Sequence, residues 1–118
     1  MSFSKQLANL DRAVALERVG GDAALLREIA ALFLEEYPIL LREIRSALDA
    51  ADPVRLERAA HTLKGSVGNF GAESAVQAAL HLETLGRTRD LGPAEDAWQR
   101  LRSEMDALHP ALAELARE

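Results

Sequence analysis

Apolar residues recur at helical spacing along most of this chain of 118 residues. The longest amphipathic run extends from Asp22 to Leu48, with apolar residues three or four positions apart. Pro38 lies inside this run, and a proline within a helix removes one backbone hydrogen bond and crowds the preceding turn. Because the apolar stripe continues in phase across Pro38, the pattern predicts a single helix with a kink at the proline.

Capping residues, glycines and prolines divide the rest of the chain into further helical segments. The pattern predicts a short helix over 12–18, a helix from 53 to about 69, a helix from about 72 that stops at Gly86, and a last helix that opens at Gly92-Pro93. Pro110 is expected to kink or end this last helix, with residues 111–117 as a further helical piece. Residues 1–10 are expected to form a loose helical lead-in.

Short connections between long amphipathic helices make neighbouring helices antiparallel. We therefore predict an all-α protein, an antiparallel up-down four-helix bundle with a short additional N-terminal helix, as a single domain over residues 1–118. The composition agrees, since the chain has 22 alanines and 20 leucines but only 8 valines and isoleucines together. Alanine and leucine lose little on entering a helix, whereas β-branched residues favour strands.

Charge and residue usage exclude several classes of function. A net charge of −5 makes nucleic acid a poor partner, because duplex-binding domains carry a basic surface. The absence of cysteine removes disulfides, thiolate metal sites and thiol nucleophiles. The longest apolar run, Ile29 to Leu34, is far shorter than the roughly 20 residues needed to span a bilayer. Because no secretory signal is visible, we expect a cytoplasmic protein without a membrane partner. We also expect a monomer, because the bundle can bury its own core.

Of the three histidines, His61 has the position that most suggests chemistry. It lies in the middle of the helix predicted from 53 to about 69, roughly 150° from the centre of the buried stripe at 100° per residue. An imidazole held on a rigid helix and facing solvent is open to a partner. The alternative is an ordinary solvated histidine.

Three residues near His61 strengthen the functional interpretation. Gly65 lies one turn later, and because a glycine inside a helix costs about 1 kcal/mol relative to alanine, its presence calls for a reason. Clearance for a bulky partner is such a reason, and Gly68 extends the bare surface; close packing of another helix is the alternative. Lys64 places an ammonium beside the ring, where it would neutralise an added anion such as a phosphoryl group.

The segment Ala59-Ala60-His61-Thr62-Leu63-Lys64-Gly65-Ser66 resembles the signature of histidine-containing phosphotransfer (HPt) domains, the intermediates of multistep two-component phosphorelays. The Gly-Gly-Asp at 20–22, the run at 33–36, Gly71-Ala72 and Leu82-Glu83 are also similar to the family pattern. The resemblance therefore covers nearly the whole chain.

This resemblance implies that His61 accepts a phosphoryl group through Nε2 from the phospho-aspartate of a response-regulator receiver domain and passes it to another receiver. It implies that Lys64 stabilises the phosphoryl group and that Gly65 leaves room for the receiver. The chain would be a phosphocarrier without turnover of its own, and not an enzyme, with a hybrid sensor kinase as a further partner. No cofactor is implied for the chain itself, because Mg²⁺ is expected on the receiver.

Counting along antiparallel helices indicates where a receiver docks. Leu34 and Leu41 lie at the edge of the buried stripe of their helix, and with Val54 they are predicted to form an apolar rim around His61. The contact is expected to be transient, so that a small patch suffices.

Other functions are less well supported by the residues. No metal site is expected, because no potential ligands converge around His81 or His109. A helix of a sensor-kinase dimerisation domain usually has an acidic residue after its histidine, and here Thr62 follows. The rival function is a helical adaptor that binds receivers without being phosphorylated, and a purely structural bundle is a further alternative.

Overall fold

The structure, a computed structural model, describes residues 10–118. Five α-helices and one short 3-10 helix occupy this part of the chain. Their bounds are α2 Arg12–Arg18, α3 Ala23–Asp49, α4 Pro53–Val67, η1 Gly68–Phe70, α5 Glu73–Thr88 and α6 Ala94–Arg117. The described residues are therefore all-α, as predicted, and the lead-in predicted over 1–10 lies outside them apart from Leu10.

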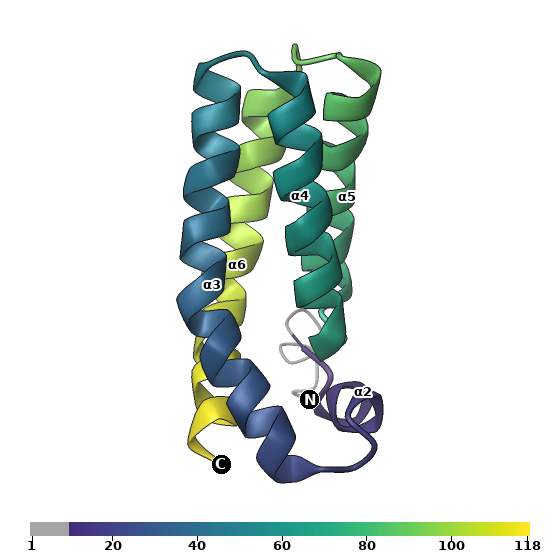
Figure 1. The fold of residues 1–118 in the computed structure, drawn as a ribbon, viewed down its shortest axis with the longest axis vertical. Helices are drawn as coiled ribbons and strands as arrows, with labels where there is room; N and C mark the ends of the chain where they lie inside the picture. The colour runs from purple at the N-terminus through teal and green to yellow at the C-terminus, as the bar shows by residue number, and fades with distance from the viewer. Residues whose placement is uncertain (1–9) are drawn as a thin grey trace.

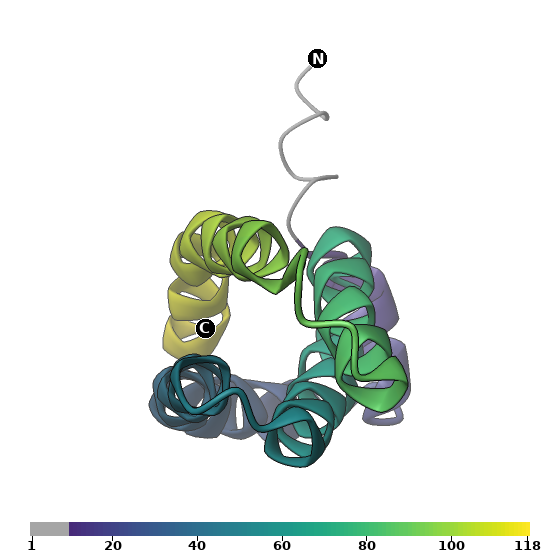
Figure 2. The same cartoon turned by 90° about the horizontal axis from the view of Figure 1, so that it is seen from above.

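The four long helices α3 to α6 form the predicted antiparallel up-down bundle (Figure 1). Seen from above, they lie at the four corners of a square, and α6 returns to pack against α3 (Figure 2). The short helix α2 lies at the end of the bundle where α4 ends, and it packs mainly against η1. This arrangement leaves one side of α4 facing outward between its neighbours α3 and α5.

Leucine and alanine stripes from all four long helices meet along the bundle axis to form the core. Among the fully buried side chains are Ile44, Leu56, Leu63, Leu82, Leu101 and Leu108. Burying each of these contributes roughly 1.5–3 kcal/mol relative to exposure. Trp98, the only tryptophan, is also buried, in agreement with its place in the apolar stripe of α6. Between residues 10 and 118, no helix is long and apolar enough to cross a membrane.

Two prolines lie inside helices, and neither ends its helix. Across Pro38, α3 remains one helix, as the continuous stripe predicted. The helix changes direction in its N-terminal half (Figure 1). Residues 111–117 are helical, as expected, but they belong to α6 itself, so Pro110 does not end that helix. Because Leu112 and Leu115 are buried beyond the proline, continued packing offsets the one hydrogen bond that is lost.

The junction between α4 and α5 differs in detail from the prediction. The last turn of the expected helix tightens into η1, so α4 ends at Val67. Gly71 follows with φ of +64°, in the left-handed region that favours glycine. A Cβ on Gly71 would lie 2.9 Å from Cβ of Asp11, so a side chain there would also collide with the start of α2.

Gly86 does not stop α5, contrary to the prediction, because it lies within the helix where α5 touches the backbone of α4. A Cβ on Gly86 would lie 2.7 Å from the amide nitrogen of Glu57 and 2.8 Å from the carbonyl oxygen of Pro53. The missing side chain therefore permits close contact between the two helices. The helix ends at Thr88 instead, followed by Arg89 with φ of 59°.

Candidate functional site

His61 lies near the middle of α4 and points outward, as the helical pattern predicted. Its side chain is 66% exposed, whereas Ala60 and Leu63 on the opposite side of the helix are fully buried. The helix itself is well defined, since the Asp52 side chain accepts a hydrogen bond from the amide of Arg55 at its start. A rigid, capped helix thus presents an imidazole to solvent.

A buried carboxylate on α5 holds the inner side of this ring. Nδ1 of His61 lies 2.8 Å from Oε2 of Glu83. Glu83 is the one charged residue classed as buried among residues 10–118. Nζ of Lys64 lies 2.7 Å from the other oxygen, Oε1, and NH1 of Arg87 lies 3.8 Å from Oε2. Glu83 therefore binds the imidazole and the Lys64 ammonium at the same time.

The charge state of Glu83 follows from these contacts. Burial raises the pKa of a carboxyl, but Lys64 and His61 together outweigh that effect, so the pKa of Glu83 is lowered from its ordinary value. Glu83 is therefore an anion at neutral pH. The Lys64 ammonium at 2.7 Å from Oε1 and the His61 ring at 2.8 Å from Oε2 both stabilise this anion through hydrogen bonds and charge.

An ionised Glu83 fixes which nitrogen of His61 carries the proton. A carboxylate only accepts hydrogen bonds, so Nδ1 of His61 must donate its hydrogen to Oε2. In a neutral imidazole, Nε2 then has a free lone pair. The site therefore presents a nucleophilic nitrogen on the exposed edge of the ring, with a positively charged ammonium one turn away.

The surroundings of His61 leave room for a partner protein. An added Cβ on Gly65 would meet nothing within 4 Å, so the surface one turn beyond the ring is open. On the other side, a hollow of about 340 Å³ is lined by Val54, Glu57, Arg58, His61 and Glu83. Val54 is 46% exposed in this hollow. The structure thus brings His61, Lys64, Gly65 and Val54 together.

The remaining predicted site residues lie elsewhere. A Cβ on Gly68 would lie 3.8 Å from Cγ2 of Val76, and Gly68 lines a groove beside α2 and not the hollow at His61. Leu34 and Leu41 are half-buried and pack against the core. Neither leucine lines the hollow around His61. Their predicted contact with a receiver therefore stays a prediction.

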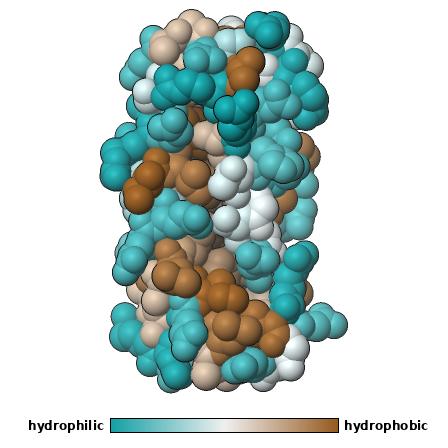
Figure 3. Space-filling view, in the orientation of Figure 1, coloured by the Kyte–Doolittle hydropathy of each residue, from teal (hydrophilic) through white to brown (hydrophobic). Residues whose placement is uncertain are grey.

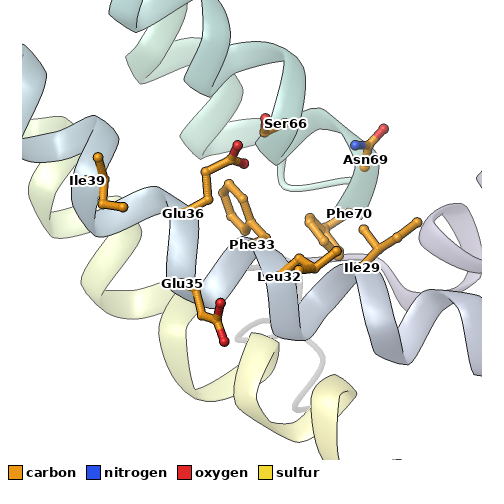
Figure 4. Close-up of a pocket in the computed structure, with 9 residues that line it drawn as sticks. All are labelled: Ile29, Leu32, Phe33, Glu35, Glu36, Ile39, Ser66, Asn69 and Phe70. Carbon is orange, nitrogen blue, oxygen red and sulfur yellow. The ribbon is translucent and has the colours of Figure 1, made fainter.

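The two most exposed large apolar side chains of α3 lie on its α4 side. Leu32 and Ile39 are 65% and 57% exposed. They line a groove of about 500 Å³ together with Ile29, Phe33 and Phe70, and with Glu35, Glu36, Ser66 and Asn69 (Figure 4). Apolar surface is gathered over this lower part of the face that carries α3 and α4 (Figure 3). The groove therefore lies on the C-terminal side of His61 along α4.

The sequence reasoning included Leu82-Glu83 in the family resemblance but missed the contact of Glu83 with His61. A signal was present, because Glu83 interrupts the apolar stripe of α5 next to Leu82 and close to Leu85. A carboxylate at a buried helical position needs a cationic or donating partner. That partner lies 22 residues earlier on another helix, which periodicity alone does not identify.

Among residues 10–118, no group of three or more histidine, aspartate or glutamate side chains is arranged to hold a metal ion. The site consists of a nucleophilic nitrogen, a carboxylate that holds the ring, and a nearby cation. Such a set can accept an anionic group on Nε2 and give it up again.

Comparison with known proteins adds sequence and structural matches. The sequence model of the Hpt domain family matches residues 28–111. No curated protein matches the chain. The structure is similar to that of histidine-containing phosphotransfer protein B from Pseudomonas aeruginosa, with 23% identity, a TM-score of 0.85, and coverage of 93% of this chain and 96% of that one. It is also similar to the HPT domain of an Hpt sensor hybrid histidine kinase from Shewanella, with 18% identity, a TM-score of 0.81, and coverage of 92% and 94%.

Proposed function

Since this chain belongs to the Hpt domain family and is a histidine phosphotransfer protein of phosphorelays, we propose that His61 carries the phosphoryl group on Nε2. The observation that supports this assignment is the hydrogen bond from Nδ1 to Glu83, which leaves Nε2 with a free lone pair on the exposed edge of the ring. His81 and His109 have no carboxylate within hydrogen-bonding distance among the described residues.

The forward step is an in-line displacement on the aspartyl phosphate of a receiver domain. The lone pair of Nε2 attacks phosphorus, an N–P bond forms, and the aspartate carboxylate leaves with the electron pair of the P–O bond. No proton has to move, because Nδ1 keeps its hydrogen. The ring gains positive charge as the bond forms, and the Glu83 carboxylate at 2.8 Å from Nδ1 stabilises that charge.

The return step uses the same arrangement in reverse. The carboxylate of a second receiver attacks phosphorus, and the electron pair of the N–P bond returns to Nε2. Because Nδ1 still carries its hydrogen, the ring leaves as a neutral imidazole and not as an anion. Glu83 is therefore a positioning residue that keeps the phosphorylated ring reactive, and it does not itself touch the phosphoryl group.

Lys64 and Gly65 serve the group that is transferred. Lys64 is 28% exposed and lies beside the ring, so its charge is available both to Glu83 and to phosphoryl oxygens on Nε2. Gly65 leaves the approach to the ring open. The Mg²⁺ and the acidic residues that bind it belong to the receiver in this proposal, and the chain has no turnover of its own.

The receiver docks on the outward side of α4 and the adjoining side of α3. Val54 borders the hollow at His61, and Leu32 and Ile39 supply further exposed apolar surface. A small apolar patch suits a short-lived contact between a carrier and its partners. The expected cytoplasmic location and monomeric state stay predictions, as does the role of a hybrid sensor kinase.

The decisive experiment is incubation of the protein with phosphorylated receiver domains of its source organism. Wild type is expected to gain acid-labile label, whereas His61→Gln gains none. His81→Gln and His109→Gln are matched controls that keep the label. If His61→Gln is labelled like wild type, the assignment is wrong. If wild type binds phosphorylated receivers but takes no label from any of them, the protein is an adaptor.

A further inference from the structure

Arg58 is a further cation beside His61, in addition to Lys64. It precedes His61 by three residues on α4, and its side chain is exposed. Its guanidinium makes no hydrogen bond or ion pair with any side chain of residues 10–118, in contrast to Arg55 and Lys64 on the same helix. What sets Arg58 apart from the other unpaired arginines is its place beside the nucleophile, in the hollow that His61 also lines.

The other cations around the site already have partners. Nζ of Lys64 lies 2.7 Å from the buried carboxylate of Glu83, and Arg87 lies 3.8 Å from the same group. Arg55 contacts Oε2 of Glu43 at 3.4 Å and Oγ of Ser46 at 3.0 Å. Arg58 is thus the uncommitted positive charge within the described surroundings of the ring.

The position of Arg58 matches that of a group added to Nε2. Residues three apart on a helix are surface neighbours, with Cβ atoms about 5–6 Å apart. At 100° per residue, Arg58 and Lys64 lie about 60° to either side of His61. Arg58 and His61 also line the same hollow, together with Val54, Glu57 and Glu83. The two cations therefore flank the exposed edge of the imidazole.

We propose that Arg58 is a second phosphoryl-binding residue, whose guanidinium binds oxygens of the phosphoryl group on the side of His61 opposite Lys64. This inference rests on the proposed function of His61. A planar guanidinium donates two parallel hydrogen bonds to phosphoryl oxygens, which an ammonium does not. The charge of Lys64 is partly neutralised by Glu83. The charge of Arg58 is not neutralised by a neighbouring side chain among the described residues, and its planar guanidinium can donate two hydrogen bonds at once.

The test uses the isolated protein, so that receiver docking does not enter. Wild type, Arg58→Gln, Arg58→Lys and Arg55→Gln are phosphorylated with phosphoramidate, and the ³¹P resonance of the phosphohistidine is followed against pH. A nearby cation favours the dianionic phosphoryl group and lowers its pKa. In Arg58→Gln this pKa is expected to rise by roughly half a unit, given the modest strength of exposed pairs. Arg58→Lys should lie between it and wild type.

Arg55→Gln is the matched control, because it removes the same charge from the same helix one turn earlier, where Glu43 and Ser46 already bind it. Its ³¹P titration should coincide with that of wild type. Transfer from a phosphorylated receiver should fall about threefold to tenfold in Arg58→Gln and remain unchanged in Arg55→Gln. Circular dichroism confirms that each variant is folded.

Three outcomes would contradict the inference. If the ³¹P titration of Arg58→Gln coincides with that of wild type, Arg58 does not touch the phosphoryl group. If transfer falls while the titration is unchanged, Arg58 contacts the receiver instead. Both results leave the role of His61 intact, provided that His61→Gln remains unlabelled. If phosphoramidate labels His61→Gln as strongly as wild type, both proposals are wrong.

Discussion

Two helix pairs of this bundle each join through a histidine, and the two histidines have opposite properties. Between α4 and α5, Nδ1 of His61 lies 2.8 Å from the carboxylate of Glu83. Between α3 and α6, Nδ1 of His109 lies 2.6 Å from the hydroxyl of Tyr37. Both rings are exposed, and both use the same nitrogen. The difference lies in the partner.

The two partners select different tautomers. Glu83 only accepts, so the proton of His61 is on Nδ1 and the lone pair is on Nε2. Tyr37 is buried, and its pKa is raised by burial and by the nearby Asp106, so it keeps its hydroxyl proton. His109 is the acceptor for that proton among the described residues, so the hydroxyl donates to Nδ1 and the ring hydrogen is on Nε2.

Exposure and a helical position therefore do not make a histidine nucleophilic in this protein. The hydrogen-bonding partner on the neighbouring helix does, because it decides which nitrogen has the lone pair and whether a positive ring is stabilised. The α4–α5 contact leaves Nε2 of His61 with its lone pair, as the proposed reaction requires, whereas the contact between Tyr37 and His109 leaves the ring hydrogen on Nε2.

The largest expected effect comes from removing the carboxylate. Glu83→Ala leaves Nδ1 without an acceptor, so we expect phosphotransfer to fall roughly 10–100-fold. Glu83→Gln should fall less, because an amide oxygen still accepts from Nδ1 but carries no charge. Tyr37→Phe is the corresponding change in the other pair and should leave transfer unchanged. The rates are measured by rapid-quench labelling from a phosphorylated receiver; equal rates for all three variants would refute the assigned role of Glu83.

Substitutions at two glycines of α4 and α5 should distinguish residues needed for phosphotransfer from residues needed for helix packing. Gly86→Ala places a Cβ 2.7 Å from the backbone of Glu57, so the free energy of unfolding should fall by roughly 3 kcal/mol. The added Cβ of Gly65→Ala would have no atom within 4 Å, so this substitution should raise the free energy of unfolding by up to about 1 kcal/mol. The larger Gly65→Leu should instead slow transfer on the order of tenfold. Urea unfolding and transfer assays on the same samples measure both effects; a strong loss of stability in Gly65→Ala would contradict this division.

The Tyr37–His109 contact should matter for stability alone. Tyr37→Phe removes one hydrogen bond while leaving the ring in place, so we expect the free energy of unfolding to fall by about 1 kcal/mol. His109→Gln is a companion variant that removes the other partner. Thermal unfolding of each variant and of the double variant measures the coupling, and additive losses would show that the contact contributes nothing.

The smallest expected effect is on the pH dependence of stability, which should differ between the His61–Glu83 contact and the Tyr37–His109 contact. The pKa of Glu83 is lowered from its ordinary value of 4.5, so its contribution to stability is present above that value and is lost as the pH falls through the folded pKa. The pKa of Tyr37 is raised from its ordinary value of 10.0, so its contribution is present below pH 10 and is lost as the pH rises through the folded pKa. Unfolding free energies across pH should therefore show a shallower acid slope in Glu83→Gln and a shallower alkaline slope in Tyr37→Phe, while Glu95 and Glu118, whose pKa values are also lowered, keep part of the acid slope. Unchanged slopes would show that these groups do not govern the titration.

The sequence predicted the parts of the site that lie on one helix. His61, Lys64 and Gly65 are separated by three and four residues, so their common position follows from helical geometry alone. The bundle followed from the spacing of leucine and alanine, because these stripes have no other way to become buried. Gly86 was misread as a helix end, since a glycine that permits close contact and one that ends a helix look the same in sequence.

Contacts between side chains on different helices could not be predicted from the sequence. Glu83 approaches His61 only because α4 and α5 pack side by side, and Gly86 permits the close approach of their backbones. The predicted rim uses Leu34 and Leu41 of α3, whereas Leu32 and Ile39 are the α3 side chains that line the α3–α4 groove, and receiver docking at either pair stays a prediction. The spacing of apolar residues locates the centre of the buried side of a helix. It does not show which neighbouring helix lies beside each edge of that buried side. Leu32 and Ile39, on the edge beside α4, proved to be the exposed side chains, whereas Leu34 is half-buried.

The separation of the reactive histidine on α4 from the exposed leucine and isoleucine on α3 has an evolutionary consequence. Substitutions at Leu32 or Ile39 alter surface that neither packs in the core nor contacts the imidazole. If receivers dock on this part of α3, as proposed, gene duplicates can change at Leu32 and Ile39 and acquire new receiver partners while α4 stays constant. Separate phosphorelays with different receivers can arise in this way while they keep the same phosphotransfer reaction.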